Sequence, residues 1–197
     1  MVVRFDSLNR FEPPKFYLCN PGSVYSDGAL TNVVGILPDT FDEELVLNFN
    51  SLSELNFRIY KPVQDGSDEI KYALQLYRAV QNRRMIFLDD IGYFVITSIS
   101  DQYDGGQYYK DVKAESCEVE IQNKMVPFIG DGTHRFTTQG DEKGILDTVV
   151  AALPLWTVDS VSESTAGKFR TFEDIGTDVN CLAFMLENMQ DAFECIF

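Results

Sequence analysis

Two stretches around residue 50 alternate apolar and polar side chains with a period of two, which is typical of β-strands that bury one face. Turn-forming residues at positions 50–53 separate the two stretches. The pattern therefore predicts a β-hairpin between Glu44 and Lys61 with one face in a core. The expected core-facing positions are Leu45, Leu47, Phe49, Leu55, Phe57 and Ile59.

The next segment, SDEIKYALQLYRAVQN at residues 67–82, changes to a helical period. Acidic residues occupy its first turn, where the positive end of the helix dipole favours them. Apolar residues then recur at helical spacing, at Ile70, Ala73, Leu74 and Tyr77. We expect a short amphipathic helix that places this stripe against a core.

A second hairpin is expected between Tyr93 and Ile121. Nearly every residue from Tyr93 to Ile99 is β-branched or aromatic, which suits a well-packed strand. The sequence Asp104-Gly105-Gly106 then supplies residues that readily adopt the positive φ angles of a tight reversal. Apolar residues change parity near Glu115, and this change predicts a β-bulge or a bend in the second strand.

The stretch that follows Pro127, IGDGTHRFTTQGDEKG, is rich in turn residues and predicts a break between two parts of the chain. After it we expect a helix that ends at Pro154, strands at 156–158 and 168–173, and a last helix from about Asp178. The expected apolar stripes are Ile145, Leu146, Val149, Val150 and Leu153 on the first helix, and Val179, Leu182, Ala183, Leu186 and Met189 on the last.

This order of elements predicts an α+β fold. A β-rich domain is expected at residues 1–128, and a smaller α/β domain at residues 129–197. The chain has 197 residues, of which 45% are hydrophobic, so both parts can form a core without disulfide bonds.

Acidic residues outnumber basic ones by 31 to 16, and the formal net charge is −15. The acids are spread along the chain, and this distribution disfavours a protein that grips nucleic acid, because phosphate binding needs clustered lysine and arginine. Two explanations stay open: the surface is acidic only for solubility, or it lines a passage through which DNA moves without sticking.

Neither a membrane span nor a secretory signal is expected. No apolar run reaches the length of about 20 residues that a bilayer requires. The first residues, MVVRFDSLNRFEPPKF, lack a long apolar stretch and soon meet Pro13 and Pro14. We therefore expect the chain to be intracellular when it is made.

Residues for a metal site are scarce in the sequence. Its four cysteines, Cys19, Cys117, Cys181 and Cys195, form no CxxC pair, and His134 is the single histidine. Free thiols and no zinc site are expected. The glycine pair after Asp104 suggests a calcium loop, but Ser100 and Gln102 stand where carboxylates or amides are needed, and Asp111 stands where a bidentate glutamate belongs. We predict no metal site.

Catalytic chemistry finds equally little support. His134 lies in a glycine-rich segment and is expected to be a solvated loop residue. Asp89 and Asp90 could imitate a pair of glycosidase acids, but adjacent residues on a strand would point to opposite faces. No phosphate-binding glycine motif occurs. We predict no catalytic residues and no cofactor.

Three tyrosines, Tyr103, Tyr108 and Tyr109, surround the predicted tip of the second hairpin. They could form a platform for carbohydrate or a contact with another protein. Amphipathic tyrosine rings are common in protein interfaces, so we favour a protein contact.

Several stretches together resemble the N-terminal region of the tail-tip, or baseplate hub, proteins of tailed bacteriophages, the phage minor structural protein or tail-associated lysin family. The matching order covers most of the chain. The stretches are LVLNFNSLSELNFRIYK, RRMIFLDDIGYFVITSIS, the DGG turn with YYKDVKAESCEVEIQNK, GILDTVVAALPLWTVDSV, KFRTFE and LAFMLENMQDAFECIF.

The resemblance implies a structural, non-enzymatic role in the virion tail, after assembly in the bacterial cytoplasm. It implies a barrel-like β domain and a homotrimeric ring that continues the tail tube, contacts the distal tail protein, tail tube or tape-measure proteins, and forms part of the DNA channel. Hub proteins of this kind continue into further domains. This sequence stops at Phe197, within an ECIF run that resembles the start of a strand, and whether the natural protein continues with a lytic or fibre-attachment domain stays open.

Two other functions stay open from the sequence. The chain could be the N-terminal part of a tail-associated cell-wall hydrolase that uses acidic residues, or an acidic adaptor domain for protein interactions. Activity against cell-wall peptide or glycan would favour the first, and a ring with a central hole would exclude the second.

Overall fold

The computed structural model describes most of the chain, which forms two compact units. The first unit comprises residues 1–117 and the second residues 118–197. The assignment of domains to 1–128 and 129–197 stays a prediction. The described residues are 4–5, 11–12, 14–26, 28–38, 40–48, 51–63, 66–128, 132–137, 144–154, 156–158, 160–173 and 178–194.

A seven-stranded sheet dominates the first unit, and all its neighbouring strands are antiparallel. The strand order is β6-β3-β9-β10-β11-β8-β7. The strands are β3 (Phe16–Cys19), β6 (Val33–Ile36), β7 (Thr40–Val46), β8 (Glu54–Tyr60), β9 (Met85–Leu88), β10 (Gly92–Asp104) and β11 (Gln107–Ser116). Two short pairs accompany the sheet, β1 (Arg4–Phe5) with β2 (Phe11–Glu12) and β4 (Tyr25–Ser26) with β5 (Ala29–Leu30).

The sheet is open, so the expected barrel-like closure is wrong. Strands β6 and β7 are its two edges and do not pair with each other in the described residues. The large antiparallel sheet with few helices agrees with the α+β class.

The first predicted hairpin is confirmed as β7 and β8. Leu55, Phe57 and Ile59 are buried, as their period of two predicts. Leu47 is 59% exposed, because β7 ends at Val46, before this position. Phe49 lies outside the described residues.

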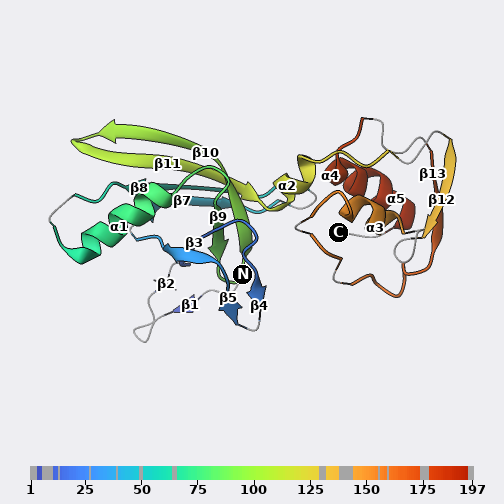
Figure 1. Ribbon diagram of the computed structural model, residues 1–197, viewed down its shortest axis with the longest axis horizontal. Coiled ribbons are helices and arrows are strands. Elements are labelled where there is room, and N and C mark those ends of the chain that lie inside the picture. Colours follow the sequence, from blue (N-terminus) through green and yellow to red (C-terminus); the bar gives the residue numbers. More distant parts are fainter. Residues whose placement is uncertain are drawn as a thin grey trace. The chain divides into compact units, whose positions relative to one another are not determined.

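The second hairpin is confirmed as β10 and β11, which form a long ribbon (Figure 1). Its reversal is at Gly105 and Gly106, which have φ angles of 56° and 88°. The second strand ends at Ser116, and helix α2 (Glu118–Gln122) follows, so the expectation of a strand as far as Ile121 is wrong. The change in the parity of apolar residues near Glu115 therefore corresponds to the end of the strand and the start of the helix.

An irregularity in strand pairing does occur, but on the other strand. The register between β10 and β11 shifts between Ile96 and Ser98, which leaves Thr97 as the extra residue. Such a bulge increases the local twist of the ribbon.

Helix α1 (Asp68–Ala79) confirms the predicted helix and shares one core with the sheet. The Ser67 side chain caps its N-terminus by accepting a hydrogen bond from the Ile70 backbone N–H. Leu74, Leu76 and Tyr77 are buried. The helix and the inner face of the sheet enclose a core that includes Leu18, Phe57, Ile59, Ile86, Phe94, Ile96 and Val112.

Gly35 on β6 allows this helix to approach the sheet closely. A Cβ atom at this position would lie 2.7 Å from Cδ2 of Leu76 and would also collide with the Tyr72 hydroxyl. Both residues belong to α1. The absence of a side chain at Gly35 is therefore a condition for the observed packing.

Lys110 on β11 ties the end of α1 to the sheet. Its Nζ donates hydrogen bonds to the backbone carbonyls of Tyr77, at 2.9 Å, and Val80, at 2.8 Å. The same ammonium lies 4.7 Å from the centre of the Tyr77 ring. Burial lowers the pKa of Lys110, and the charge of Asp101 opposes this change. The cation satisfies carbonyls that the helix end leaves without partners.

In the second unit a two-stranded antiparallel ribbon packs with short helices. The ribbon consists of β12 (Thr133–Thr137) and β13 (Phe169–Glu173). The helices are α2, α3 (Ile145–Val150), and a C-terminal run of α4 (Cys181–Ala183), the π-helix η2 (Phe184–Met189) and α5 (Gln190–Phe193). Their core includes Phe136, Ile145, Leu146, Val149, Leu153, Phe172, Cys181, Phe184, Met189 and Phe193.

Sequence patterns predicted this unit less well. Strand β12 occupies a segment expected to be turns, and residues 156–158 form no strand. Helix α3 ends at Val150, four residues before Pro154. The last helix buries Phe184 and Met189, five residues apart, because its π-helical turn brings residues at that spacing onto one face.

We predict that Gly35→Ala lowers the free energy of unfolding by about 1–3 kcal/mol, because the new methyl group overpacks the contact with α1. Urea unfolding followed by circular dichroism measures the change. In a Tyr72→Phe background the loss should be smaller, since the hydroxyl is gone while Leu76 remains. Equal stability of Gly35→Ala and wild type would contradict the prediction.

Lys110→Met is expected to lower the free energy of unfolding by about 1–3 kcal/mol, because it leaves buried carbonyls at the end of α1 without a donor. The matched control is Lys71→Met, which removes an exposed ion pair with Asp68 and should cost about 0.5 kcal/mol or less. Chemical denaturation of both variants checks this difference. An equal loss in the two would show that Lys110 has no special role.

Candidate functional site

The face of the large sheet opposite its core is the candidate site of this protein. On β8 and β11 the buried residues alternate with polar ones, so the second face of these strands is charged. Five acids and two bases gather there, from β7, β8 and β11. They are Asp42, Glu44, Glu54, Asp111, Glu115, Arg58 and Lys113, and this set is called the polar face below.

Arg58 joins three neighbouring strands. Its Nη1 lies 2.6 Å from Oδ2 of Asp42 on β7, and its Nε lies 2.5 Å from Oδ1 of Asp111 on β11. The guanidinium carbon is 5.5 Å from the centre of the Tyr109 ring. The hydrogen bond that Arg58 donates to Asp111, with the charge of that carboxylate, raises the pKa of Arg58. This side chain is therefore held in one orientation by contacts on two sides.

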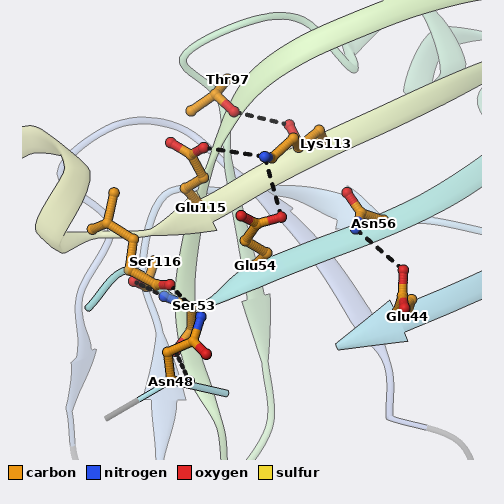
Figure 2. Close-up of polar contacts among 10 residues, drawn as sticks. Glu44, Asn48, Ser53, Glu54, Asn56, Thr97, Lys113, Glu115 and Ser116 are labelled. Carbon is orange, nitrogen blue, oxygen red and sulfur yellow. Dashed lines mark hydrogen bonds and ion pairs between the residues drawn. The ribbon is translucent and has the colours of Figure 1, made fainter. Parts of the chain in front are cut away.

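Lys113 forms a second charged group next to the first. Its Nζ lies 3.1 Å from a carboxylate oxygen of Glu54 and 3.5 Å from one of Glu115 (Figure 2). The hydrogen bond with Glu54 raises the pKa of Lys113. Figure 2 also shows the Asn56 amide, which donates to Glu44 over 3.5 Å. Since the ions are more than one third exposed except for Glu115, their attraction is screened by water and adds little to stability.

Between these groups lies an open groove of about 450 Å³. Exposed Ser98 and Ser100 of β10 contribute hydroxyl groups to it. The groove offers both donors and acceptors, with an excess of carboxylates. Such a surface suits a polar contact with another protein, because paired charges select a partner with the complementary arrangement.

The two aspartates considered as catalytic acids lie in a turn, so the strand expected for them is wrong. Asp89 and Asp90 connect β9 to β10, and Asp90 has a φ angle of 63°. The reason is local: aspartate tolerates the left-handed region, and Gly92 follows with a φ angle of 133°.

His134 is likewise not a loop residue, which corrects the expectation from its glycine-rich surroundings. It is half-buried on β12, opposite Phe172 in register, and its ring centre is 6.2 Å from that of Phe136. The turn-forming residues on both sides of His134 are the reason that the sequence pattern did not predict this strand.

The tyrosines near the hairpin tip separate into two groups. Tyr103 and Tyr108 are cross-strand neighbours with ring centres 4.6 Å apart, and they are 62% and 54% exposed. Tyr109 points to the other face and joins Phe41 and Tyr60, whose rings stack at 4.0 Å. The second group borders the polar face, next to Arg58.

Three of the cysteines lie in the described part of the chain, and they are free thiols. Cys19 and Cys181 are buried, and burial raises the pKa of both thiols, which makes them poor nucleophiles. Cys195 lies outside the described residues. Within the described ranges, no group of three or more histidine, cysteine, aspartate or glutamate side chains could hold a metal ion. The absence of a metal site from the protein stays a prediction.

Sequence reasoning missed the polar face. The sequence pattern that could have identified it is the alternation of polar with buried residues along two strands. On β8 the polar residues are Glu54, Asn56 and Arg58, and on β11 they are Asp111, Lys113 and Glu115. The pairing of Arg58 with Asp42 and Asp111 depended on strand order, which the pattern did not contain. None of the helices in the described part of the chain has the length and apolar character needed to cross a membrane.

Comparison with known proteins identifies a likeness in structure only. No protein-family model matches the sequence, and no curated protein matches it. The structure is similar to the prophage tail protein gp18 from Listeria monocytogenes EGD-e, with a TM-score of 0.59 and 12% sequence identity. The match covers 92% of this chain and 47% of that protein, so the chain spans about half the length of its structural neighbour. The chain therefore has the fold of part of a phage tail protein.

Proposed function

We propose that this chain is a structural component of a phage or prophage tail. The observation that carries the proposal is the likeness in fold to a prophage tail protein, which extends over 92% of the chain and so includes both units. Fold alone does not specify function. The polar face adds a surface suited to contacts between proteins, and this agrees with a structural role.

Within the tail, we assign the chain to the tail tip, as a baseplate hub component of the virion. There it joins the tail tube and the distal tail protein to the host-facing tip. Three copies form a ring, and the polar face contacts a neighbouring subunit or tail protein. The role is non-enzymatic, because four of the five acids of the polar face are engaged with Arg58 and Lys113 rather than arranged around a reacting bond.

The excess of acids has a use in this setting. A ring that continues the tail tube must let DNA pass, and a wall with carboxylates repels phosphates instead of binding them. The formal charge of −15 per chain gives three copies −45, since 3 × 15 is 45. A share of these acids faces the channel in the proposed ring.

Assembly is tested by the mass of the protein in solution. Sedimentation equilibrium should give a trimer, and electron microscopy should show a ring with a central hole. Ser98→Arg fills the groove of the polar face without removing a charge pair, and it should shift the trimer towards monomer. Gln75→Arg, which adds the same charge on an exposed position of α1, should leave the trimer intact.

Two results would count against this assembly. A chain that stays monomeric at high concentration, both alone and with the distal tail protein, would contradict the ring. Cleavage of peptidoglycan that disappears in His134→Ala, with the fold retained, would instead favour the cell-wall hydrolase.

DNA is expected to pass through the ring without binding. A mobility-shift assay with duplex DNA at about 0.1 M salt should show no complex, because 31 acids against 16 bases repel the phosphates. A reconstructed ring should have no strongly basic inner wall. A shifted band that weakens steeply with added salt would contradict the conduit.

A further inference from the structure

The distal half of β10, residues 98–104, forms a strand edge inside the order of the large sheet. Strand β9 pairs with β10 only from Gly92 to Val95, and main-chain bonds to Arg83 and Arg84 extend the contact as far as Ile96. Beyond that point β10 pairs with β11 on one side and with no other strand of the described residues. Figure 1 shows this half of the ribbon extending away from β9. Residues 98–104 are called the β10 edge below.

The register of the hairpin decides which main-chain groups point out of this edge. Gly105 and Gly106 are a two-residue loop, so Asp104 and Gln107 form a hydrogen-bonded pair, and such pairs recur at every second residue. Ser100 and Gln102 therefore bond to β11. The N–H and C=O groups of the residues between them, at positions 99, 101 and 103, point away from β11.

Two observed bonds support this alternation. On β11 the carbonyl of Tyr108 accepts a hydrogen bond from the Lys61 N–H at 2.8 Å, so Tyr108 also points away from its partner in the hairpin. On β10 the N–H of Ile96 donates to the Arg84 carbonyl at 2.8 Å, on the β9 side. The bulge at Thr97 then moves the outward position from Ile96 to position 99.

The outward groups of the β10 edge are accessible. Within the described part of the chain, the main chains of Ile99, Asp101 and Tyr103 accept and donate no hydrogen bond on the outer side. Residues 100–104 are all exposed, and Tyr103 is 62% exposed. Three donors and three acceptors thus face water at the spacing of a β-ladder, which is the arrangement that an added strand requires.

The other two edges of the sheet are less suited to an added strand. Strand β6 has only four residues. Strand β7 has a shift of register between Phe41 and Glu44, and Asp42 within it has a φ angle of 51°. Short and bulged edges resist pairing with another chain. The β10 edge pairs with β11 from Ser98 to Asp104 without a shift.

Side chains on the two faces of the β10 edge define the partner. On the α1 face, Ile99 packs against the core, and Tyr103 lies beside the Tyr108 ring at 4.6 Å. On the opposite face, Ser98 and Ser100 border the groove of the polar face, where five acids meet two bases. An added strand therefore meets apolar and aromatic groups on one face and an excess of negative charge on the other.

We propose that the β10 edge binds an extended segment of a partner protein in which apolar and basic residues alternate. The segment adds a strand antiparallel to β10 and exchanges main-chain hydrogen bonds with Ile99, Asp101 and Tyr103. Its apolar side chains lie on the α1 face and its basic side chains on the polar face. A second copy of this chain fits the edge less well, because each copy has a formal charge of −15. The inference goes beyond the proposed tail function and does not depend on it.

Binding is tested on the full chain, labelled with ¹⁵N, by nuclear magnetic resonance. The probe is the peptide acetyl-Lys-Val-Lys-Val-Lys-Val-Lys-amide, which matches the length of the edge. It should shift the amide signals of Ile99, Asp101 and Tyr103 in a saturable way and slow the hydrogen exchange of these three amides. The exchange of Ser100 and Gln102 should change little, since these amides already bond to β11.

Methylated peptides test the main-chain bonds without changing the protein. A methyl group on the nitrogen of each valine removes the N–H groups that point to β10, and binding should be lost. Methyl groups on the lysine nitrogens alter the N–H groups that point to water, so this matched control should still bind.

Charge is tested by a peptide with glutamate in place of lysine. It should bind at least about tenfold more weakly at low salt, because the polar face and the whole chain are negative. The difference should shrink at about 0.5 M salt.

Asp101→Pro tests the edge from the side of the protein. Proline removes the central outward N–H and is tolerated on an open edge, so binding should be lost while the ribbon persists. Slow exchange of the Ser100 and Gln102 amides shows that the ribbon is intact. Asp101→Ala removes the same carboxylate but keeps the N–H, and saturable binding should remain.

Several results would overturn the proposal. Equal binding of the two methylated peptides would exclude main-chain pairing in the proposed register. Equal binding of the glutamate peptide at low salt would exclude a basic partner. Protection of the same three amides that rises with protein concentration, without peptide, would identify a second copy as the occupant. No shift of these amides with the lysine peptide at millimolar concentration would exclude the site.

Discussion

The packing of α1 on the inner face of the large sheet is the contact on which the first unit depends. An open sheet of seven strands has one apolar face that must be covered, because exposed apolar surface of that extent is unfavourable in water. The helix covers it with Leu74, Leu76 and Tyr77. Two features of the sheet fit the helix: Gly35 gives it room, and Lys110 binds its C-terminal carbonyls.

This arrangement directs the polar residues of β8 and β11 to the other face of the sheet. Strands alternate their side chains, so burying one face against α1 turns Arg58, Asp111 and Lys113 towards water on the other. Towards β3 and β9 the same face changes from charged to aromatic, with Tyr17 and Phe87. One face of the sheet thus carries an ordered set of charges and, beside it, a cluster of aromatic rings.

Charge pairing restricts which neighbour can bind the polar face. Four of its five acids are paired with two bases, so a neighbour must match an ordered pattern. The likeness to a prophage tail protein concerns the fold, and the polar face is a property of this sequence.

The sequence by itself determined the elements that rest on neighbouring residues. The period of two specified β8, the Gly105-Gly106 pair specified the β10–β11 reversal, and Ser67 with the acids after it specified the start of α1. These features could be predicted because hydrophobic period, positive φ and helix capping act over a few residues.

Tertiary structure alone decided how distant segments meet. Strand β3 pairs with β9 and β12 pairs with β13, across long stretches of chain, and no local period encodes such a choice of partner. The ion pairs of Arg58 and the rings around Phe87 follow from these pairings. The polar residues of the candidate site were therefore readable in the sequence, but their assembly into a site was not, because strand order is set by the packing of the whole core.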